Sequence, residues 1–238
     1  MWTCILCSAK NFGTPLFDRE AATCGSCSAT WRARAMVLAI ISGLGYKPKP
    51  LNKINSDWSR IGIGISDDVN VSSRLSTQFF YSNTFFDIFP NLDIRNIPKI
   101  AESVFEFVSC SDVLEHIDTG LNKGIRGISR LLKPNGFAVL SVPVCYTSDQ
   151  LEFYPGLKSF EIVGEVVKWK NRTGEQFTDS SPEFHGGRGQ NLAFRQFTDE
   201  TFRSAVLNNG FKEIEIGPIN AGLGVPASGL SGIYIARV

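Results

Sequence analysis

The chain has 238 residues, of which 43% are hydrophobic and 20% are charged. This length accommodates one α/β domain and a small accessory element, and the composition excludes a disordered protein. The net charge is +1 and no basic run occurs, which argues against a nucleic-acid partner. No apolar run reaches the length of a membrane span, and the first residues do not form a signal peptide. We therefore expect a cytoplasmic protein with no membrane partner.

Residues 1–28 have little core-forming periodicity but carry four of the six cysteines. Two Cys-x-x-Cys pairs, Cys4 with Cys7 and Cys24 with Cys27, are separated by sixteen residues. Thiols stay reduced in the cytoplasm, so these pairs indicate metal ligands rather than disulfides. Four thiolates fill the tetrahedral shell of Zn²⁺ and leave no open position for catalysis. We predict that residues 1–28 form a structural zinc-binding knuckle that depends on the metal to fold.

From residue 29 onward, segments with helical periodicity alternate with short apolar segments. Helices are predicted at 29–44, 71–78, 120–132, 160–169 and 198–208. Strands are predicted at 58–65, 79–86, 104–109, 137–142, 211–216 and 232–238. This alternation predicts a doubly wound α/β domain over residues 29–238, with a mostly parallel sheet and helices on both faces.

Residues 145–195 interrupt the alternation and are rich in glycine, proline and aromatic residues. An idle connection of this length is uncommon in a compact domain, and the aromatic content argues against disorder. We expect this insertion to form a cap that selects the substrate. Its aromatic side chains are suited to the wall of a dry pocket: Tyr146, Phe153, Tyr154, Phe160, Trp169 and Phe184.

Polar and glycine residues follow the predicted strands where a ligand of an open α/β sheet would bind. Gly62 and Gly64 close the first strand, Asp93 follows the second, and Asp112 with His116 follows the third. Ligands of such sheets bind at the carboxyl ends of the strands, and glycine allows the backbone to approach a ligand closely. We therefore expect the binding site at this edge of the sheet.

Two sequence motifs resemble those of class I S-adenosylmethionine-dependent methyltransferases: Asp112-Val-Leu-Glu-His-Ile and Leu132-Lys-Pro-Asn-Gly. The resemblance covers residues 57–142 and 196–238. It implies a Rossmann-like sheet with an antiparallel last strand and S-adenosylmethionine as cofactor. Cysteine pairs before such a domain resemble a subset of small-molecule methyltransferases, often of sugar or surface-glycan pathways.

The resemblance also implies roles for individual residues. Gly62 and Gly64 would border the methionine moiety, Asp93 would accept from the adenine amino group, and Asp112 would lie near the methionine end of the cofactor.

The sequence departs from the family pattern at three points. Arg60 stands where the family usually has an acid, two residues before the first glycine, and Ser66 stands where it usually has a third glycine. The third departure is at the end of the second strand, where the family has a ribose-binding acid and the nearest candidate in this sequence is Asp87.

The expected reaction is methylation of a small molecule or a sugar or glycan precursor, with a hydroxyl as the expected acceptor. The protein would supply alignment and a dry pocket, and a hydroxyl acceptor also needs a general base. The chain has only two histidines, His116 and His185, and both are candidates, although each is also compatible with a structural role. Further candidates for the acceptor site are Tyr146, Tyr154, Glu183, Arg188 and Arg195.

Two other functions are compatible with the sequence. An RNA methyltransferase would use the knuckle, with Arg32 and Arg34, to grip RNA. A non-catalytic protein-binding module would account for Arg60 and Ser66. The sequence leaves the acceptor and the oligomeric state open.

Overall fold

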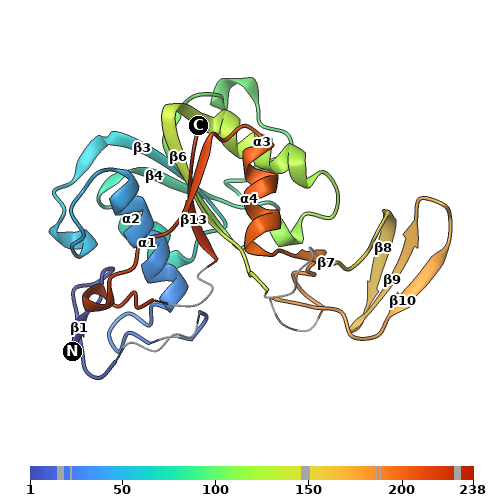
Figure 1. Ribbon diagram of the computed structural model, residues 1–238, viewed down its shortest axis with the longest axis horizontal. Helices are drawn as coiled ribbons and strands as arrows, with labels where there is room; N and C mark the ends of the chain where they lie inside the picture. The colour runs from blue at the N-terminus through green and yellow to red at the C-terminus, as the bar shows by residue number, and fades with distance from the viewer. Residues whose placement is uncertain (15–18, 22, 146–150, 186, 188, 228–231) are drawn as a thin grey trace.

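The computed structural model describes residues 1–14, 19–21, 23–145, 151–185, 187, 189–227 and 232–238. Its centre is a six-stranded sheet in the order β12-β13-β6-β5-β3-β4 (Figure 1). The strands are β3 (Asp57–Ile65), β4 (Phe79–Thr84), β5 (Phe105–Ser111), β6 (Leu132–Ser141), β12 (Glu213–Ile216) and β13 (Ile233–Arg237).

Strands β3 to β6 run parallel, and β13 is antiparallel to both β6 and β12. This topology confirms the predicted Rossmann-like, mostly parallel sheet with an antiparallel last strand.

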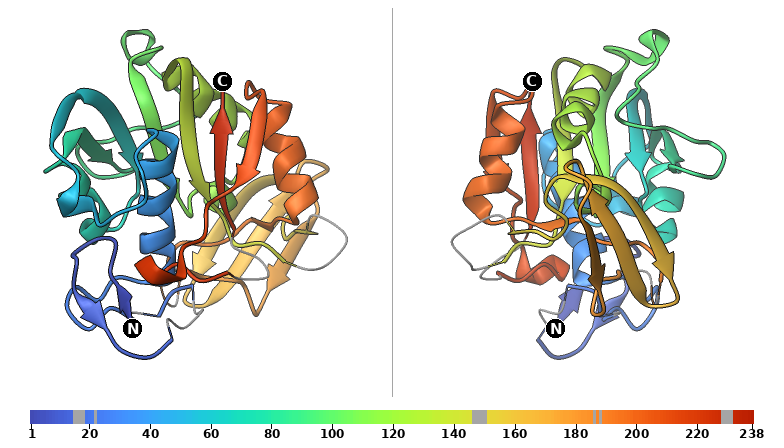
Figure 2. Two further views of the ribbon diagram at one scale, coloured as in Figure 1. Left: turned by 60° about the vertical axis from the view of Figure 1, so that its left-hand side comes forward. Right: turned by 90° about the vertical axis from the view of Figure 1, so that its right-hand side faces the viewer.

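Four helices cover the two faces of this sheet (Figures 1 and 2). They are α1 (Trp31–Gly43), α2 (Val69–Leu75), α3 (Leu121–Leu131) and α4 (Asp199–Leu207). Strand side chains alternate between the faces, so Phe107 is buried with α1 and α2, whereas Val108 is buried with α3 and α4. None of the helices in the described part of the chain is both long and apolar enough to cross a lipid bilayer.

The helices begin where the sequence supplies caps. Thr30 and Thr198 accept hydrogen bonds from the backbone N–H groups of Ala33 and Thr201, at the starts of α1 and α4. After α3 the chain continues directly into β6, which begins at Leu132 and includes Asn135, with a left-handed φ of 64°, in an irregular stretch of its pairing with β5.

A layer of stacked aromatic rings explains the glycines of β3. The Phe107 ring lies 5.8 Å from that of Tyr81 and 6.0 Å from that of Phe137, centroid to centroid. A Cβ atom on Gly62 would lie 2.2 Å from the Phe107 ring, and one on Gly64 would lie 2.0 Å from the Tyr81 hydroxyl. Both glycines are therefore required by packing within the core.

The insertion contains strands in place of the helix predicted at 160–169, and that prediction was wrong. Strands β8 (Leu157–Val163), β9 (Val166–Asn171) and β10 (Gln176–Asp179) form an antiparallel sheet that projects from the main body (Figure 1). Gly164, with φ of 65°, supplies the left-handed residue of the two-residue turn between β8 and β9. The β-branched residues around this turn favour the hairpin over a helix.

The short strands β7 (Leu151–Glu152) and β11 (Arg195–Gln196) pair at the base of the insertion. A separate small core of Tyr154, Leu157, Val167, Leu192 and Phe194 stabilises this part of the chain. The insertion is thus a folded unit attached at both ends beside the main sheet.

The N-terminal segment packs directly on the main body. Strands β1 (Trp2–Thr3) and β2 (Lys10–Asn11) form a small ribbon beside the start of α1 (Figures 1 and 2). Trp2, Ile5 and Leu6 are buried in the same hydrophobic cluster as α1. This segment therefore shares a core with the α/β domain.

We expect Gly62→Ala to lower the free energy of unfolding by about 1 to 3 kcal/mol, because the buried Phe107 ring must shift to admit the new methyl group. Urea unfolding measures this change. Gly25→Ala is the matched control, since its nearest neighbour, Asn11 Oδ1, is 3.9 Å from the added Cβ atom. Equal stability of the two variants would contradict the packing role of Gly62.

Candidate active site

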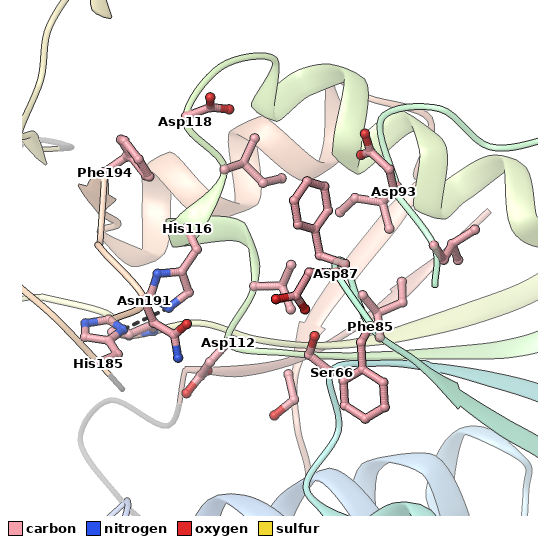
Figure 3. A pocket seen from close by; sticks show the side chains of 18 of the residues that line it. Ser66, Phe85, Asp87, Asp93, Asp112, His116, Asp118, His185, Asn191 and Phe194 are labelled. Carbon is pink, nitrogen blue, oxygen red and sulfur yellow. Dashed lines mark hydrogen bonds between the residues drawn. The ribbon is translucent and has the colours of Figure 1, made fainter. Parts of the chain in front are cut away.

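A cavity of about 940 Å³ lies at the carboxyl edge of the parallel strands (Figure 3). Residues that follow β3, β4 and β5 form its floor, and Phe160, Asn191 and Phe194 of the insertion close one side. The cavity brings together most of the polar residues singled out in the sequence: Ser66, Asp87, Asp93, Asp112, His116 and His185. Gly62 and Gly64 lie inside β3, outside this lining.

Two residues of the cavity floor have a left-handed backbone. Ser66, directly after β3, has φ of 57°, and Asp112, directly after β5, has φ of 50°. This conformation is costly for residues with a side chain, and such strain concentrates at functional sites. At Ser66 it also explains why the family pattern prefers glycine.

Asp93 is held by its own loop. Its carboxylate accepts from the Arg95 backbone N–H at 2.9 Å, from Arg95 Nε at 3.0 Å and from Asn96 Nδ2 at 2.9 Å. Burial acts to raise the pKa of Asp93, but these hydrogen bonds lower it overall. The Arg95 guanidinium lies over the Phe86 ring and pairs with Asp118 at 2.8 Å. Asp93 is thus ionised and fixed in place at the cavity wall.

Asp112 is bound by two arginines from the N-terminal part of the chain. Arg19 donates to both of its carboxylate oxygens at 2.6 Å, and Arg32 Nε lies 3.2 Å from Oδ2. Arg32 also donates to Ser111 at 2.6 Å and pairs with Glu20. Burial acts to raise the pKa of Asp112, but Arg19 and Arg32 lower it to about 2.

Sequence reasoning missed Arg19 as a residue of the cavity wall. It lies between the two cysteine pairs, and its partner is 93 residues away, so no local pattern connects them. Arg32 and Arg34 were considered as contacts for RNA. Arg34 is instead fully buried, donating to the carbonyl oxygens of Gly224 and Ala29, and Arg32 is engaged at the cavity. Neither offers the free surface cation that the RNA hypothesis requires.

The two histidines meet at the wall of the cavity, and the dashed line between them in Figure 3 joins two ring nitrogens. His116 Nε2 and His185 Nδ1 are 3.2 Å apart. His116 Nδ1 lies 2.9 Å from the Leu192 carbonyl oxygen, and His185 Nε2 lies 3.0 Å from Glu183 Oε1. The carboxylates of Glu115 and Glu183 raise the pKa of His185 to about 9 against the effect of burial.

Glu115 lies beneath this pair and was also missed as a site residue, although it stands next to His116 in the quoted motif. Its side chain is 1% exposed, and neither carboxylate oxygen makes a hydrogen bond. Oε1 lies 3.7 Å from His185 Nδ1 and 3.8 Å from His116 Nε2. Burial raises the pKa of Glu115.

The remaining acceptor candidates have other surroundings. Tyr154 is buried in the core of the insertion and donates to Asp179. Arg195 is buried, pairs with Glu152 at 2.8 Å, and does not line the cavity. Tyr146 and Arg188 lie outside the described residues.

The four N-terminal cysteines converge as a separate cluster. Cys4 and Cys27 have their sulfur atoms 3.8 Å apart, and those of Cys7 and Cys24 are 3.7 Å apart. Four ligands at a Zn–S distance of about 2.3 Å are about 3.8 Å apart in a tetrahedron. The donor set and its spacing therefore fit one Zn²⁺ ion.

The two cysteine turns share the sequence Cys-x-x-Cys-Ser-Ala and the same backbone path. The N–H groups of Ser8 and Ser28 each donate to the carbonyl oxygen of the preceding Cys4 or Cys24 at 2.9 Å. Ser8 and Ser28 both have a left-handed φ, of 66° and 55°. This six-residue repeat was not predicted from the sequence, and it gives the two cysteine turns the same local structure.

A sheet of this topology, with a strand-end cavity of this kind, defines an α/β enzyme of the methyltransferase class. Residues 61–215 match the family model described as a methyltransferase domain, and they are 155 of the 238 residues. The chain belongs to this family, as an S-adenosylmethionine-dependent methyltransferase.

Several solved structures are similar to the chain at low identity. An S-adenosylmethionine-dependent methyltransferase from Clostridium acetobutylicum is 11% identical, with a TM-score of 0.48 over 88% of this chain and 91% of that one. The sugar N-methyltransferase KedS8 from Streptoalloteichus is 12% identical, with a TM-score of 0.48 over 96% and 98%. CalS10, an amino pentose methyltransferase from Micromonospora echinaspora, is 13% identical, with a TM-score of 0.46 over 88% and 92%. No curated protein matches the sequence.

The depressed pKa of Asp112 predicts how its contribution to stability varies with pH. A carboxylate with a folded pKa of about 2, against 3.8 for the free group, stabilises the fold above pH 4 and loses this effect as the pH falls toward 2. We expect Asp112→Asn to cost about 2 kcal/mol of unfolding free energy at pH 7 and progressively less below pH 4. Denaturant unfolding of both proteins between pH 2 and 7 measures the difference. A difference independent of pH would contradict the ion pair.

Proposed function

We propose that this methyltransferase transfers a methyl group from S-adenosylmethionine to a hydroxyl group of a small molecule or of a sugar or glycan precursor. The observation that carries this proposal is the meeting of His116 and His185 at the strand-end cavity. A hydroxyl acceptor must lose its proton during transfer, and positioned histidines are the side chains most often used for this purpose. Because the pKa of His185 is raised to about 9, this base would be available mainly at alkaline pH, and the transfer rate would rise as the pH approaches 9. The cavity volume is in the range of small-molecule sites.

The cofactor would lie along the ends of β3, β4 and β5, where it supplies an activated methyl group when bound. Ser66 and Asp112 would flank its methionine end, Asp87 would contact the ribose, and Asp93 would lie near the adenine. All four side chains line the cavity, and the left-handed backbone at Ser66 and Asp112 supports a close approach of a ligand there.

The acceptor would enter from the side of the insertion. Phe160, Asn191 and Phe194 line the cavity there and come from the segment expected to act as a cap. Aromatic walls exclude water from the reacting groups, and the polar side chains at the wall can orient an acceptor. We assign residues 145–195 to acceptor selection on this basis.

Residues 1–28 would form a zinc knuckle in which Cys4, Cys7, Cys24 and Cys27 hold one structural ion. The sulfur spacing and the purely thiolate donor set support this assignment. No disulfide joins Cys4, Cys7, Cys24 or Cys27, and a thiolate site needs reduced cysteines, which supports a cytoplasmic location.

We expect His185→Ala to lower methyl transfer by about 10²-fold or more and to leave the affinity for S-adenosylmethionine unchanged, because His185 lies on the acceptor side of the cavity. Transfer from radiolabelled cofactor to a panel of sugars and small hydroxylated compounds identifies the acceptor, and calorimetry measures cofactor affinity. Glu161→Ala, an exposed change in the same insertion, is the control. An unchanged transfer rate would remove His185 from the reaction.

We expect freshly purified protein to contain one zinc ion per chain and Cys24→Ser to lose it. The variant should keep a folded α/β core but bind S-adenosylmethionine more weakly, because Arg19 lies between the cysteine pairs and contacts Asp112. Elemental analysis and cofactor titration measure the two effects, with Cys145→Ser as control. Arg19→Ala should retain zinc and share the weaker cofactor binding. Full cofactor affinity in both variants would contradict a contribution of the knuckle to cofactor binding.

A further inference from the structure

Three metal-ligating side chains meet at the edge of the cavity: His116 and His185 line it, and Glu115 is buried next to them. One donor atom from each lies within 4.8 Å of the others. We propose that these three residues bind a divalent cation, and that this ion receives the acceptor hydroxyl. The role of the ion in the reaction rests on the proposed function, whereas its binding does not.

The outer hydrogen bonds of the two rings leave two lone pairs facing each other. A carbonyl oxygen only accepts, so His116 Nδ1 must donate to Leu192 at 2.9 Å, and Nε2 is left as the acceptor nitrogen. Glu183 likewise accepts from His185 Nε2 at 3.0 Å and directs Nδ1 inward. Metal-ligating histidines almost always donate their other ring N–H to a carboxylate or a backbone carbonyl. Here His116 donates to a backbone carbonyl and His185 to a carboxylate.

Without a cation, the inward nitrogens need a proton between them, since two lone pairs 3.2 Å apart repel each other. A cation in place of this proton would satisfy both nitrogens at once. Two nitrogens that each lie about 2.1 Å from one ion are about 3.0 to 3.4 Å apart, for angles between a right angle and the tetrahedral angle. The observed separation falls within this range.

Glu115 supplies the negative charge that a cation requires. A carboxylate that is 1% exposed and makes no hydrogen bond is costly to bury, and such groups are generally paired or bound to metals. Asp112, only three residues earlier, shows the contrast, because two arginines and Ser141 bind its carboxylate. Within the described residues, the ion-pair partners of Glu115 within 4 Å are the two histidines.

The ligand set selects a class of ion different from that of the cysteine cluster. Two imidazoles and one carboxylate suit first-row divalent ions such as Mn²⁺, Fe²⁺ or Zn²⁺ and leave coordination positions open. Four thiolates select a soft ion and leave none. Mn²⁺ prefers oxygen and nitrogen donors to thiolates, so it can probe the histidine site in protein whose cysteine cluster already holds zinc.

An ion at this position would act as a Lewis acid on the acceptor. Coordination lowers the pKa of a bound hydroxyl, whose proton leaves to water. The oxygen lone pair then forms the new O–CH₃ bond, while the S–CH₃ bond of the sulfonium breaks and its electron pair stays on sulfur. With the ion bound, His116 and His185 would hold it and so position the acceptor oxygen, and the lowered pKa of the bound hydroxyl would replace the general base of the proposed function.

The test is Mn²⁺ binding to the zinc-loaded full chain, followed by electron paramagnetic resonance without acceptor. We expect one Mn²⁺ ion per chain and a loss of affinity of at least about 10-fold in His185→Ala. Asp93→Asn, which changes a carboxylate of the same cavity outside the three ligands, is the matched control and should bind normally. Absence of Mn²⁺ binding, or equal binding by His185→Ala and the parent protein, would overturn the proposal.

A second variant tests the orientation of His185 without changing any of the three ligands, since a substitution of the buried Glu115 could misfold the protein. Glu183→Ala removes the carboxylate that orients His185 and that also accepts from Gln196 Nε2 at 3.0 Å, and it should weaken Mn²⁺ binding by about 10- to 100-fold without loss of circular dichroism. Binding unaffected by this change would count against the proposed geometry.

The failure of each proposal is recognisable. Mn²⁺ bound at these residues in a protein that methylates only nitrogen or carbon would refute the hydroxyl acceptor but retain the metal site. Hydroxyl methylation without any bound Mn²⁺ would refute the metal site alone.

Discussion

The ion pair between Arg19 and Asp112 connects the N-terminal segment that carries the cysteines to the cavity at the strand ends. Parallel pairing of β3, β5 and β6 brings the ends of these strands to one edge, and β5 ends at Ser111 directly beside the cavity. Asp112 then turns into a left-handed conformation that aims its carboxylate at Arg19. A carboxylate whose side chain is only 17% exposed is costly to desolvate unless it is paired. The segment that carries Arg19 is therefore part of the cavity wall.

The charges at this edge are distributed unequally. Asp112 has two guanidinium partners, and its pKa falls to about 2, whereas among the described residues Glu115 pairs with histidines instead, and burial raises its pKa. Both carboxylates occur within four residues of one strand end, so their difference comes from tertiary neighbours rather than from local sequence. A buried acid whose neighbours are two imidazole rings, rather than guanidinium groups, supports the proposed cation site.

The sequence predicted those features that depend on local pattern. The strands of the main sheet and the cysteine pairs all have signals within a few residues. The segment 160–169 was misread because its apolar residues are compatible with both periods, and only Gly164 and the β-branched residues favour a hairpin. Gly62 and Gly64 were detected as special positions, but the partners that require them, Phe107 and Tyr81, are neighbours only in the folded sheet.

The site itself was predictable only in part for the same physical reason. Strand-end acids such as Asp112 follow from sheet topology, but the pairing of His116 with His185 spans 69 residues, and that of Arg19 with Asp112 spans 93. Long-range pairs of this kind leave no periodic signal, and the insertion that carries His185 is irregular in composition.

The proposed zinc ion at the cysteine cluster would have a physical role in the methyltransferase domain. Sixteen residues separate the two cysteine pairs, and Arg19 lies within them. A free segment of this length would lose considerable entropy on placing one guanidinium against Asp112. An ion that ties both ends of the segment together removes much of that freedom beforehand. The packing of Ile5 and Leu6 with α1 then fixes the tied ends against the domain. In this arrangement the proposed metal would stabilise the position of a cavity residue more than it would stabilise a separate domain.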